Sequence, residues 1–433
     1  MELTIVSLLC IVGLFVFMML GVPIVYSLGF CAVAAGLFLF GSNCLPKVGW
    51  TPFHMLFNLA WTPLPLFVFL GSLASQTAIG QDLFKAAANW LGRIPGGLIV
   101  SGIFGEAAMA ATLGTSAATI VVVGKVAVPE FERYGYNRSL SLGALLAGGA
   151  LGPLIPPSAT FIIISVLADL SLGKLFMAGI IPGIILAIML SIPAVVICLW
   201  KPEFAPRLEK VSWGERLFSL RRVWPVAVVI ISILGAIYMG VATPTESAGV
   251  GCVIVLIIGV VFFGLRWQGL RQAMTEAAVI NAMILFILVG ASFFTYVVGS
   301  ANVAKYLLTI IESTAISPWL VIIAINVILL FLGCILEPLT ITLLTIPIFI
   351  PLIESLGFDP LWFAVVFSVN TQIGLITPPM GIDLFAVKTI FNIPTGDILR
   401  GVTPFLLFLL IFLAVIVAFP TLSLWLPGMM VGR

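Results

Sequence analysis

Long apolar segments follow one another along almost the whole chain, separated by short polar connections. An α-helix of about 20 apolar residues crosses the hydrocarbon core of a bilayer. A membrane barrel would instead show short strands with alternating apolar and polar positions. The pattern therefore predicts an all-α, polytopic membrane protein. The continuous spans are residues 3–20, 22–42, 56–80, 139–165, 175–200, 223–241, 248–265, 277–299, 361–387 and 403–426.

Two further apolar stretches, residues 97–128 and 318–350, are interrupted near their midpoints. The first is broken at 112–116 (TLGTS) and the second between Gly333 and Pro338. A long apolar stretch with a polar or glycine-rich midpoint fits a re-entrant helical hairpin, which needs protein or a cavity to cover its tip. One long tilted helix is the alternative for each stretch.

Glycine and proline interrupt two of the predicted spans midway, at GPLIPPS (152–158) and GLITPPMG (374–381). Proline lacks an N–H and clashes with the preceding turn, while glycine permits unusual dihedral angles. We therefore expect two broken helices, each with an unwound linker. Linker carbonyls could bind a cation, and helix N-termini could face an anion. A structural proline kink is the alternative.

The same pattern occurs twice in the chain, 222 residues apart. PEFERYGYN (129–137) and GPLIPP (152–157) correspond to PLIESLGFD (351–359) and GLITPP (374–379). Further upstream the offset becomes 219. Two related halves with broken apolar segments are typical of secondary transporters. The upstream pairs are Gly71 and Gly290, Gly80 and Gly299, and Gly114 and Gly333.

Composition agrees with this prediction. Of 433 residues, 62% are hydrophobic and 8% are charged, whereas soluble domains carry roughly 25% charged residues. A net charge of +2 gives no indication of a nucleic-acid partner. We find no phosphate-binding loop for ATP, no His/Cys metal cluster and no nucleophile–base pair in the sequence. We therefore expect a protein that is not an enzyme and that is driven by a gradient.

Lysine and arginine set the expected orientation, because cytoplasmic loops carry them in excess. Residues 201–222 hold six basic residues, so this loop should be cytoplasmic, and basic residues also flank the first hairpin. The matching connection in the second half, residues 351–360, has none. The two halves should therefore be inverted in the membrane. Hairpin one would open to the cytoplasm and hairpin two to the outside, and both chain termini would be external.

This reading divides the chain into five parts. Residues 1–80 and 223–300 would be scaffold helices, and residues 201–222 a cytoplasmic linker. The transport parts would be residues 81–200, with hairpin one and its broken helix, and residues 301–433, with hairpin two and its broken helix.

Ionisable residues inside membrane spans are costly and mark candidate functional sites. For Glu106 and Glu246 we favour carboxylates hydrogen-bonded to local backbone or hydroxyl groups. Glu337 and Asp383 are as well explained by a function as by structure. Small polar residues near the breaks could line a site for a polar solute, although they also serve helix packing. The candidate substrate residues are Thr112, Thr115, Ser158, Glu337, Asn370 and Asp383.

At these motifs the chain resembles the large membrane subunit of tripartite ATP-independent periplasmic (TRAP) transporters. The matching segments are NRSLSLGALL (137–146), GPLIPPS, GKLFMAGIIPG (173–183), TPTESA (243–248), LEPLT (336–340) and NTQIGLITPPMG (370–381). The resemblance implies sodium-driven import of an organic acid by an elevator mechanism, in a bacterial or archaeal inner membrane. It also implies two partners, an extracytoplasmic substrate-binding protein and a small four-helix membrane subunit.

The resemblance further implies at least two sodium sites built mostly from main-chain oxygens. The chain departs from the usual SGSS at the first hairpin, having LGTS at 113–116, so that Leu113 could offer only its carbonyl. Asp383 stands where the family usually has a neutral residue, and could alter substrate choice or pair with Lys388. Carried onto this sequence, site one comprises Leu113, Ser116, Gly152, Ile155 and Pro157, and site two comprises Gly333, Gly374, Thr377 and Met380.

Other functions remain open at this point. A sodium/dicarboxylate carrier that works without a binding protein could have a similar inverted-repeat design. Broken helices alone would also allow an ion channel, whose flux would neither saturate nor require sodium. A membrane-embedded hydrolase is disfavoured by the lack of a catalytic pair in the sequence.

Overall fold

A computed structural model describes residues 2–208, 211–300, 303–314, 316–378, 381–391 and 393–430, and every regular element in these ranges is helical. The predicted all-α class is confirmed. The helices are α1 (Glu2–Met19), α2 (Ile24–Phe40), α3 (Leu45–Leu56), α4 (Pro63–Ser75), α5 (Ile79–Leu91), α6 (Gly97–Leu113), α7 (Ser116–Arg133), α8 (Arg138–Gly148), α9 (Ala159–Leu167), α10 (Leu172–Trp200), α11 (Trp213–Ile230), α12 (Ala236–Tyr238), α13 (Pro244–Phe262), α14 (Trp267–Ser300), α15 (Val303–Thr314), α16 (Pro318–Gly333), α17 (Pro338–Ser355), α18 (Pro360–Ile376), α19 (Ile382–Phe391), α20 (Thr395–Ala418) and α21 (Thr421–Gly428).

Short turns of tighter or wider helix connect some of these elements. They include η1 (Gly41–Cys44), η2 (Leu59–Trp61), η3 (Gly149–Leu151) and the π turn η5 (Ile231–Gly235). Because η1 joins α2 to α3 and η5 joins α11 to α12, each pair forms one continuous helical segment. Within the described residues, seven helical segments are long and apolar enough to cross a membrane. They are Ile24–Leu56, Leu172–Trp200, Trp213–Tyr238, Pro244–Phe262, Trp267–Ser300, Pro338–Ser355 and Thr395–Ala418.

Several predicted spans are divided in the structure. The spans 139–165 and 361–387 each form two shorter helices, α8 with α9 and α18 with α19. The predicted span 56–80 corresponds to Leu59–Ser75 and ends at a bend, since this segment and Ile79–Leu91 meet at an angle of 67°. The stretch 97–128 forms α6 and α7, and 318–350 forms α16 and α17, so neither is one long tilted helix.

The predicted linker 201–222 is also partly helical. Ser212 and Glu215 form a capping box, in which the Ser212 hydroxyl accepts from the Glu215 N–H and the Glu215 carboxylate accepts from the Ser212 N–H. Such a box satisfies free donors at a helix start, so α11 begins at Trp213. The Trp90 indole donates to the Arg216 carbonyl at 3.2 Å, which ties α11 to α5. Ser212 is thus a helix cap, not a position in an open loop.

Helix boundaries recur at the spacing that the sequence repeat predicts. Helices α7 and α17 begin and end 222 residues apart. Asn137 and Asp359 correspond in the repeat, and each caps the following helix with a side-chain oxygen. Gly135 and Gly357 also correspond, and each has a positive φ, 67° and 83°, a conformation that glycine adopts without strain. The two segments therefore fold alike locally.

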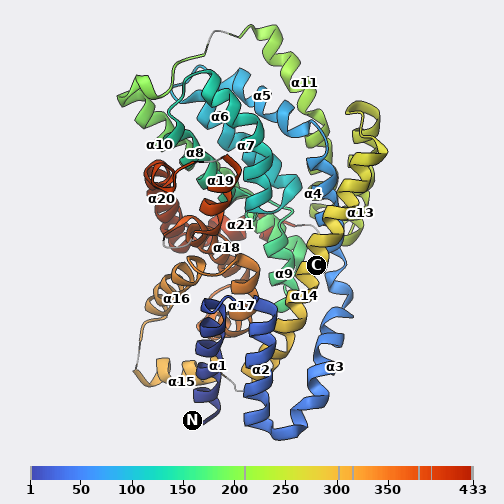
Figure 1. Cartoon of the computed structure of the whole chain (residues 1–433), viewed down its shortest axis with the longest axis vertical. Coiled ribbons are helices and arrows are strands. Elements are labelled where there is room, and N and C mark those ends of the chain that lie inside the picture. The colour runs from blue at the N-terminus through green and yellow to red at the C-terminus, as the bar shows by residue number, and fades with distance from the viewer. Residues whose placement is uncertain are drawn as a thin grey trace.

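The arrangement in space places the two helix pairs apart (Figure 1). Helices α6 and α7 lie in the upper part with α5 and α11, while α16 and α17 lie in the lower part with α1, α2 and α15. Helices α9, α18, α19 and α21 occupy the middle, and α20 packs on α8, α10 and α18. The long helix α14 packs on α2, α3, α4 and α17. One continuous apolar core runs through these elements.

Candidate functional site

The tip of the α6/α7 pair rests directly on the linker of the first broken helix. Helix α6 ends where Gly114 takes a positive φ of 66°, and α7 begins at Ser116. A Cβ added at Gly114 would lie 2.5 Å from the Pro157 carbonyl oxygen. The Ala159 N–H donates to the Gly114 carbonyl at 3.3 Å. Glycine is thus required at the tip both by its φ angle and by the close backbone approach.

The linker of the first broken helix is held by side-chain hydrogen bonds. After α8 and η3, residues 152–158 leave the helix before α9 starts at Ala159. The Ser158 hydroxyl caps α9 and donates to the Pro153 carbonyl at 2.5 Å. Ser368 of α18 donates to the same carbonyl at 3.1 Å. The predicted interruption is therefore present, and the two broken helices touch each other at Pro153.

The second helix pair and the second break are joined through two glycines. Helix α16 ends at Gly333, and α18 passes it at Gly374, where a Cβ added at Gly333 would lie 2.8 Å from the Gly374 Cα. Helix α18 ends at Ile376, and the Thr377 hydroxyl donates to the Ile373 carbonyl at 2.5 Å. Helix α19 resumes at Ile382. Pro379 and Met380 lie outside the described residues.

The structure brings together most residues of expected sodium site one. A Cβ added at Gly152 would lie 2.8 Å from the Ser116 nitrogen, and the Pro157 carbonyl is at the hairpin tip. The backbone of Leu113 instead packs against Gly71 of α4, and the side chain of Ile155 packs against Gly183 of α10. For site two, Gly333, Gly374 and Thr377 lie together at the end of α18.

The chemistry of both linkers fits a small hard cation. In an α-helix the carbonyls of Gly152 and Gly374 would accept from the N–H four residues later. Those residues are Pro156 and Pro378, which have no N–H. Neither glycine carbonyl therefore has its usual helical partner, although the Gly374 carbonyl accepts from the Thr377 N–H at 3.0 Å. Carbonyl oxygens are ligands that suit hard cations.

A cavity of about 120 Å³ opens beside the hairpin-one tip. Two of the candidate substrate residues, Thr112 and Thr115, line it. The cavity also borders the first linker at Pro157 and the helices α4 and α14, whereas no residue of α16 or α17 lines it. Its lining is Leu64, Phe67, Val68, Gly71, Ser72, Ser75, Thr112, Leu113, Gly114, Thr115, Ala118, Pro157, Ala159, Ile162, Glu276 and Ile280.

The other candidate substrate residues lie elsewhere. Buried Asn370 donates to the side chain of Asn326 on α16 at 2.7 Å. Glu337 precedes α17 at its N-cap position. Ser158 is occupied by its cap, and Asp383 accepts from Ser116. None of these four residues lines the cavity that holds Thr112 and Thr115, although Ser158 stands between Pro157 and Ala159, which do.

One polar group of this cavity was not anticipated from the sequence. Glu276 on α14 accepts from the Gln76 amide at 3.3 Å and from the Gln272 amide at 3.0 Å. The sequence pattern started the predicted span at residue 277, so Glu276 counted as part of a connection. Because α14 begins at Trp267, Glu276 lies within a helix that faces the cavity.

The structure also tests the predictions made for the acidic residues of the membrane spans. Glu246 is locally satisfied as predicted, since it accepts from the Thr243 N–H at 2.7 Å and hydroxyl at 2.8 Å. The same expectation for Glu106 is wrong, because neither of its buried carboxylate oxygens has a hydrogen-bond partner. Asp383 contacts Ser116 at 2.5 Å and does not pair with Lys388, whose amine lies 5.8 Å from the Phe385 ring centre.

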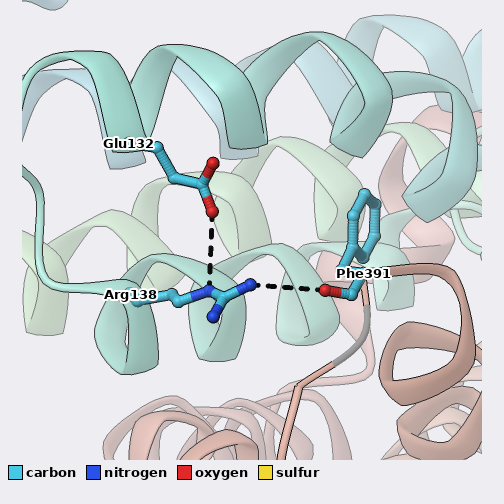
Figure 2. Close-up of polar contacts among 3 residues, drawn as sticks. All are labelled: Glu132, Arg138 and Phe391. Atoms are coloured by element: carbon cyan, nitrogen blue, oxygen red, sulfur yellow. Dashed lines mark hydrogen bonds and ion pairs between the residues drawn. The ribbon is translucent and has the colours of Figure 1, made fainter.

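A separate contact joins the first half to the end of the second broken helix. Figure 2 shows Arg138, the first residue of α8, between Glu132 of α7 and the Phe391 carbonyl at the end of α19. The guanidinium Nε is 3.5 Å from Glu132 Oε1, and Nη2 donates to the carbonyl at 3.4 Å. This contact ties the hairpin-one helices to α19, so the two halves meet at their broken helices.

Comparison with known proteins identifies the family. The family described as "Tripartite ATP-independent periplasmic transporter, DctM component" matches residues 11–422. This chain belongs to that family. It is 30% identical over 445 residues to the C4-dicarboxylate TRAP transporter large permease protein DctM of Rhodobacter capsulatus, covering 98% of this chain and 99% of that protein.

Other relatives are named after different substrates. The chain is 30% identical to the sialic acid TRAP transporter large permease SiaM of Vibrio cholerae, covering 95% of this chain and 96% of that one. It is 31% identical to the ectoine permease TeaC of Halomonas elongata, covering 84% and 85%. The TRAP permease is thus a transporter subunit and not an enzyme.

The fold also matches a solved transporter. The crystal structure of the YdaH transporter of Alcanivorax borkumensis aligns with a TM-score of 0.62 at 15% identity, covering 96% of this chain and 98% of that chain. At this identity the likeness concerns the fold alone. It agrees with the all-helical membrane architecture described above.

Proposed function

We propose that this TRAP permease imports a small organic acid together with sodium ions across a bacterial or archaeal inner membrane. The observation that carries the proposal is the pair of hairpin tips seated on proline-broken linkers, Gly114 on Pro157 and Gly333 on Gly374. Carbonyls that the prolines leave without their usual helical partner favour a cation there. Sodium binding would fix each tip on its linker and so close the site around the substrate.

The proposed mechanism is an elevator. The hairpins and broken helices, residues 81–200 and 301–433, would move as one unit against scaffold helices that include α4 and α14. The hydrogen bond from Ser368 to the Pro153 carbonyl supports a single unit, because it joins the broken helices of both halves. The cavity between the hairpin-one tip and α4 lies along the surface at which such a unit would slide.

The proposed partners follow from the family. An extracytoplasmic binding protein would deliver the acid, and a small four-helix membrane subunit would complete the scaffold. Many apolar side chains in the scaffold segments are exposed, among them Phe57 after α3 at 81% and Leu59 in η2 at 87%. Lipid or that small subunit would cover them, since exposed apolar surface of this extent is unfavourable in water.

Reconstituted uptake tests the proposal. The permease and its small subunit would be placed in liposomes with the binding protein outside, and radiolabelled C4-dicarboxylates, sialic acid and ectoine would be offered in turn. We expect saturable uptake of one of these compounds that requires an inward sodium gradient. Equal uptake with choline in place of sodium would contradict sodium coupling. Full uptake without the binding protein would instead favour the binding-protein-independent carrier.

A further inference from the structure

Two acidic side chains are buried where hairpin one meets the second broken helix. Glu106 comes from the middle of α6 and is 0% exposed, and Asp383 comes from the first turn of α19 and is 3% exposed. The two carboxylates interact electrostatically. The Ser116 hydroxyl, at the start of α7, donates to Asp383 Oδ2 at 2.5 Å. Three elements thus bring three oxygen-bearing side chains to one place.

Two consecutive glycines at the end of α8 make room for this group. A Cβ at Gly148 would overlap Glu106 Oε2, and a Cβ at Gly149 would lie 2.7 Å from the Ser116 hydroxyl oxygen. Glu106 and Ser116 therefore face the same end of α8. The carbonyl end of a helix carries partial negative charge, so α8 disfavours a carboxylate there and favours a cation.

Asp383 is better compensated than Glu106. It lies in the first turn of α19 and contacts the first residue of α7, and helix N-termini stabilise negative charge. Glu106 lies in mid-helix, and both of its oxygens lack a hydrogen-bond partner. A buried, unpaired carboxylate is costly, and such groups in proteins are paired or coordinate a metal ion.

No basic side chain supplies the missing charge among the described residues of the helices packed on α6, α7 and α19. Lys125 on α7 and Lys388 on α19 are exposed. Arg138 on α8 pairs with Glu132, and Arg222 on α11 with Asp82 on α5. The other ionisable groups of these helices are Lys85 on α5, Glu130 and Arg133 on α7, Lys174 and Cys198 on α10, Glu215, Arg216 and Arg221 on α11, and Asp397 and Arg400 on α20. The charge acting on Glu106 is that of Asp383, of the same sign.

We propose that Glu106, Asp383 and the Ser116 hydroxyl bind a sodium ion. This inference rests on the proposed sodium coupling and adds to it two acidic ligands that the main-chain sites expected from the family do not include. Carboxylate and hydroxyl oxygens are ligands that hard cations prefer. Because the ligands come from hairpin one and from α19, an ion here would hold the two halves together during transport.

Sodium binding to the purified complex tests the proposal directly. The complex with the small subunit would be titrated with ²²Na⁺ at constant pH and ionic strength, with choline as the replacing cation, and its thermal stability followed in parallel. For Glu106→Gln and Asp383→Asn we expect one fewer sodium ion bound per chain. We also expect at least a 10-fold rise in the sodium concentration that gives half-maximal stabilisation. Glu354→Gln, at an exposed position of α17, should leave both readouts unchanged.

The outcomes separate this inference from the proposed function. If the wild type takes up substrate with sodium but both variants bind sodium as it does, this site is wrong and the proposed function stands. If uptake by the wild type does not depend on sodium, the proposed sodium coupling is wrong. Glu106→Asp, which keeps the charge, should retain more sodium binding than Glu106→Gln, and equal loss in the two would also overturn the proposal. A pH-dependent binding defect without a change in sodium stoichiometry would indicate a proton site and contradict it.

Discussion

Gly374, near the end of α18, packs so closely against hairpin two that a larger residue should disturb the second break. A Cβ there would overlap the backbone of Gly333, and overpacking of this kind costs about 1–3 kcal/mol. We expect Gly374→Val to lower sodium-dependent uptake about 10-fold or more, with the protein still present in the membrane. Gly249→Val is the control, because a Cβ at Gly249 meets no atom within 4 Å. Near-normal uptake by Gly374→Val would remove this contact from the mechanism.

Thr377 allows a milder test of the same site. Its hydroxyl donates to the Ile373 carbonyl at 2.5 Å, so Thr377→Ala removes one hydrogen bond at the end of α18, worth about 1 kcal/mol. The sodium concentration for half-maximal uptake should rise about 5-fold. Thr403→Ala removes an equivalent bond, from Thr403 to Leu399 at 2.7 Å on exposed α20 surface, and should have no effect. An identical sodium dependence in both variants would argue against site two.

Local residue roles could be predicted from the sequence, whereas contacts distant in the chain could not. The cap formed by Glu246 follows from its spacing of three residues to Thr243. The contact of Ser116 with Asp383 joins residues 267 positions apart, which no local spacing indicates. Asp383 and Lys388 are five residues apart, which places them on different faces of α19, because helix neighbours are three or four residues apart. Their predicted pairing therefore fails, and the buried Asp383 carboxylate instead accepts from Ser116 of α7.

At the scale of elements, a charge added at the hairpin-one tip should change the affinity for the substrate. Thr115 lines the cavity beside α4 and α14. An aspartate there would repel an organic anion by a few kcal/mol at an effective dielectric constant near 20, which is about 10- to 100-fold in affinity. We expect Thr115→Asp to raise the KM for the native acid accordingly. Ser116 is unsuited to this test, because its neighbour is already Asp383.

Thr421→Asp is the matched control for this prediction. Thr421 is exposed at the start of α21, where a negative charge is well tolerated. Its KM should equal that of the wild type. An unchanged KM in Thr115→Asp as well would place the substrate away from the hairpin-one tip.

The broken helices are the elements that the sequence predicted best. Proline and glycine interrupt the apolar segment at each break, and the repeat shows the same interruption twice. The start of α11 was missed within a basic segment, although Ser212 and Glu215 carry the capping-box spacing and residues 223–230 fall in a predicted span. The bend between α4 and α5 lies near the predicted end of the span 56–80, where Gln76, Thr77 and Gln81 interrupt the apolar residues. Helices α3 and α15 were missed since they are short and only partly apolar.

At the scale of the whole molecule, the inverted orientation of the halves is open to direct labelling. Ser212 before α11 and Ser355 at the end of α17 are both exposed, and the six native cysteines are buried. In a background lacking those cysteines, an impermeant thiol reagent added outside intact cells should label Ser355→Cys but not Ser212→Cys. Labelling of both positions from outside would contradict the inverted arrangement.

The central claim is that hairpins and broken helices move as one unit against the scaffold. Spin labels at Tyr134 (α7 end) and Phe262 (α13 end), which are 40% and 61% exposed, would report the distance between unit and scaffold. Labels at Tyr134 and Ile390 would report a distance within the unit. Pulsed electron paramagnetic resonance of the reconstituted complex, with and without sodium and substrate, should show the first distance shifting by at least one helical turn, about 5 Å. The second distance should stay constant. A first distance that is the same in all conditions, or a second that changes as much as the first, would contradict the account.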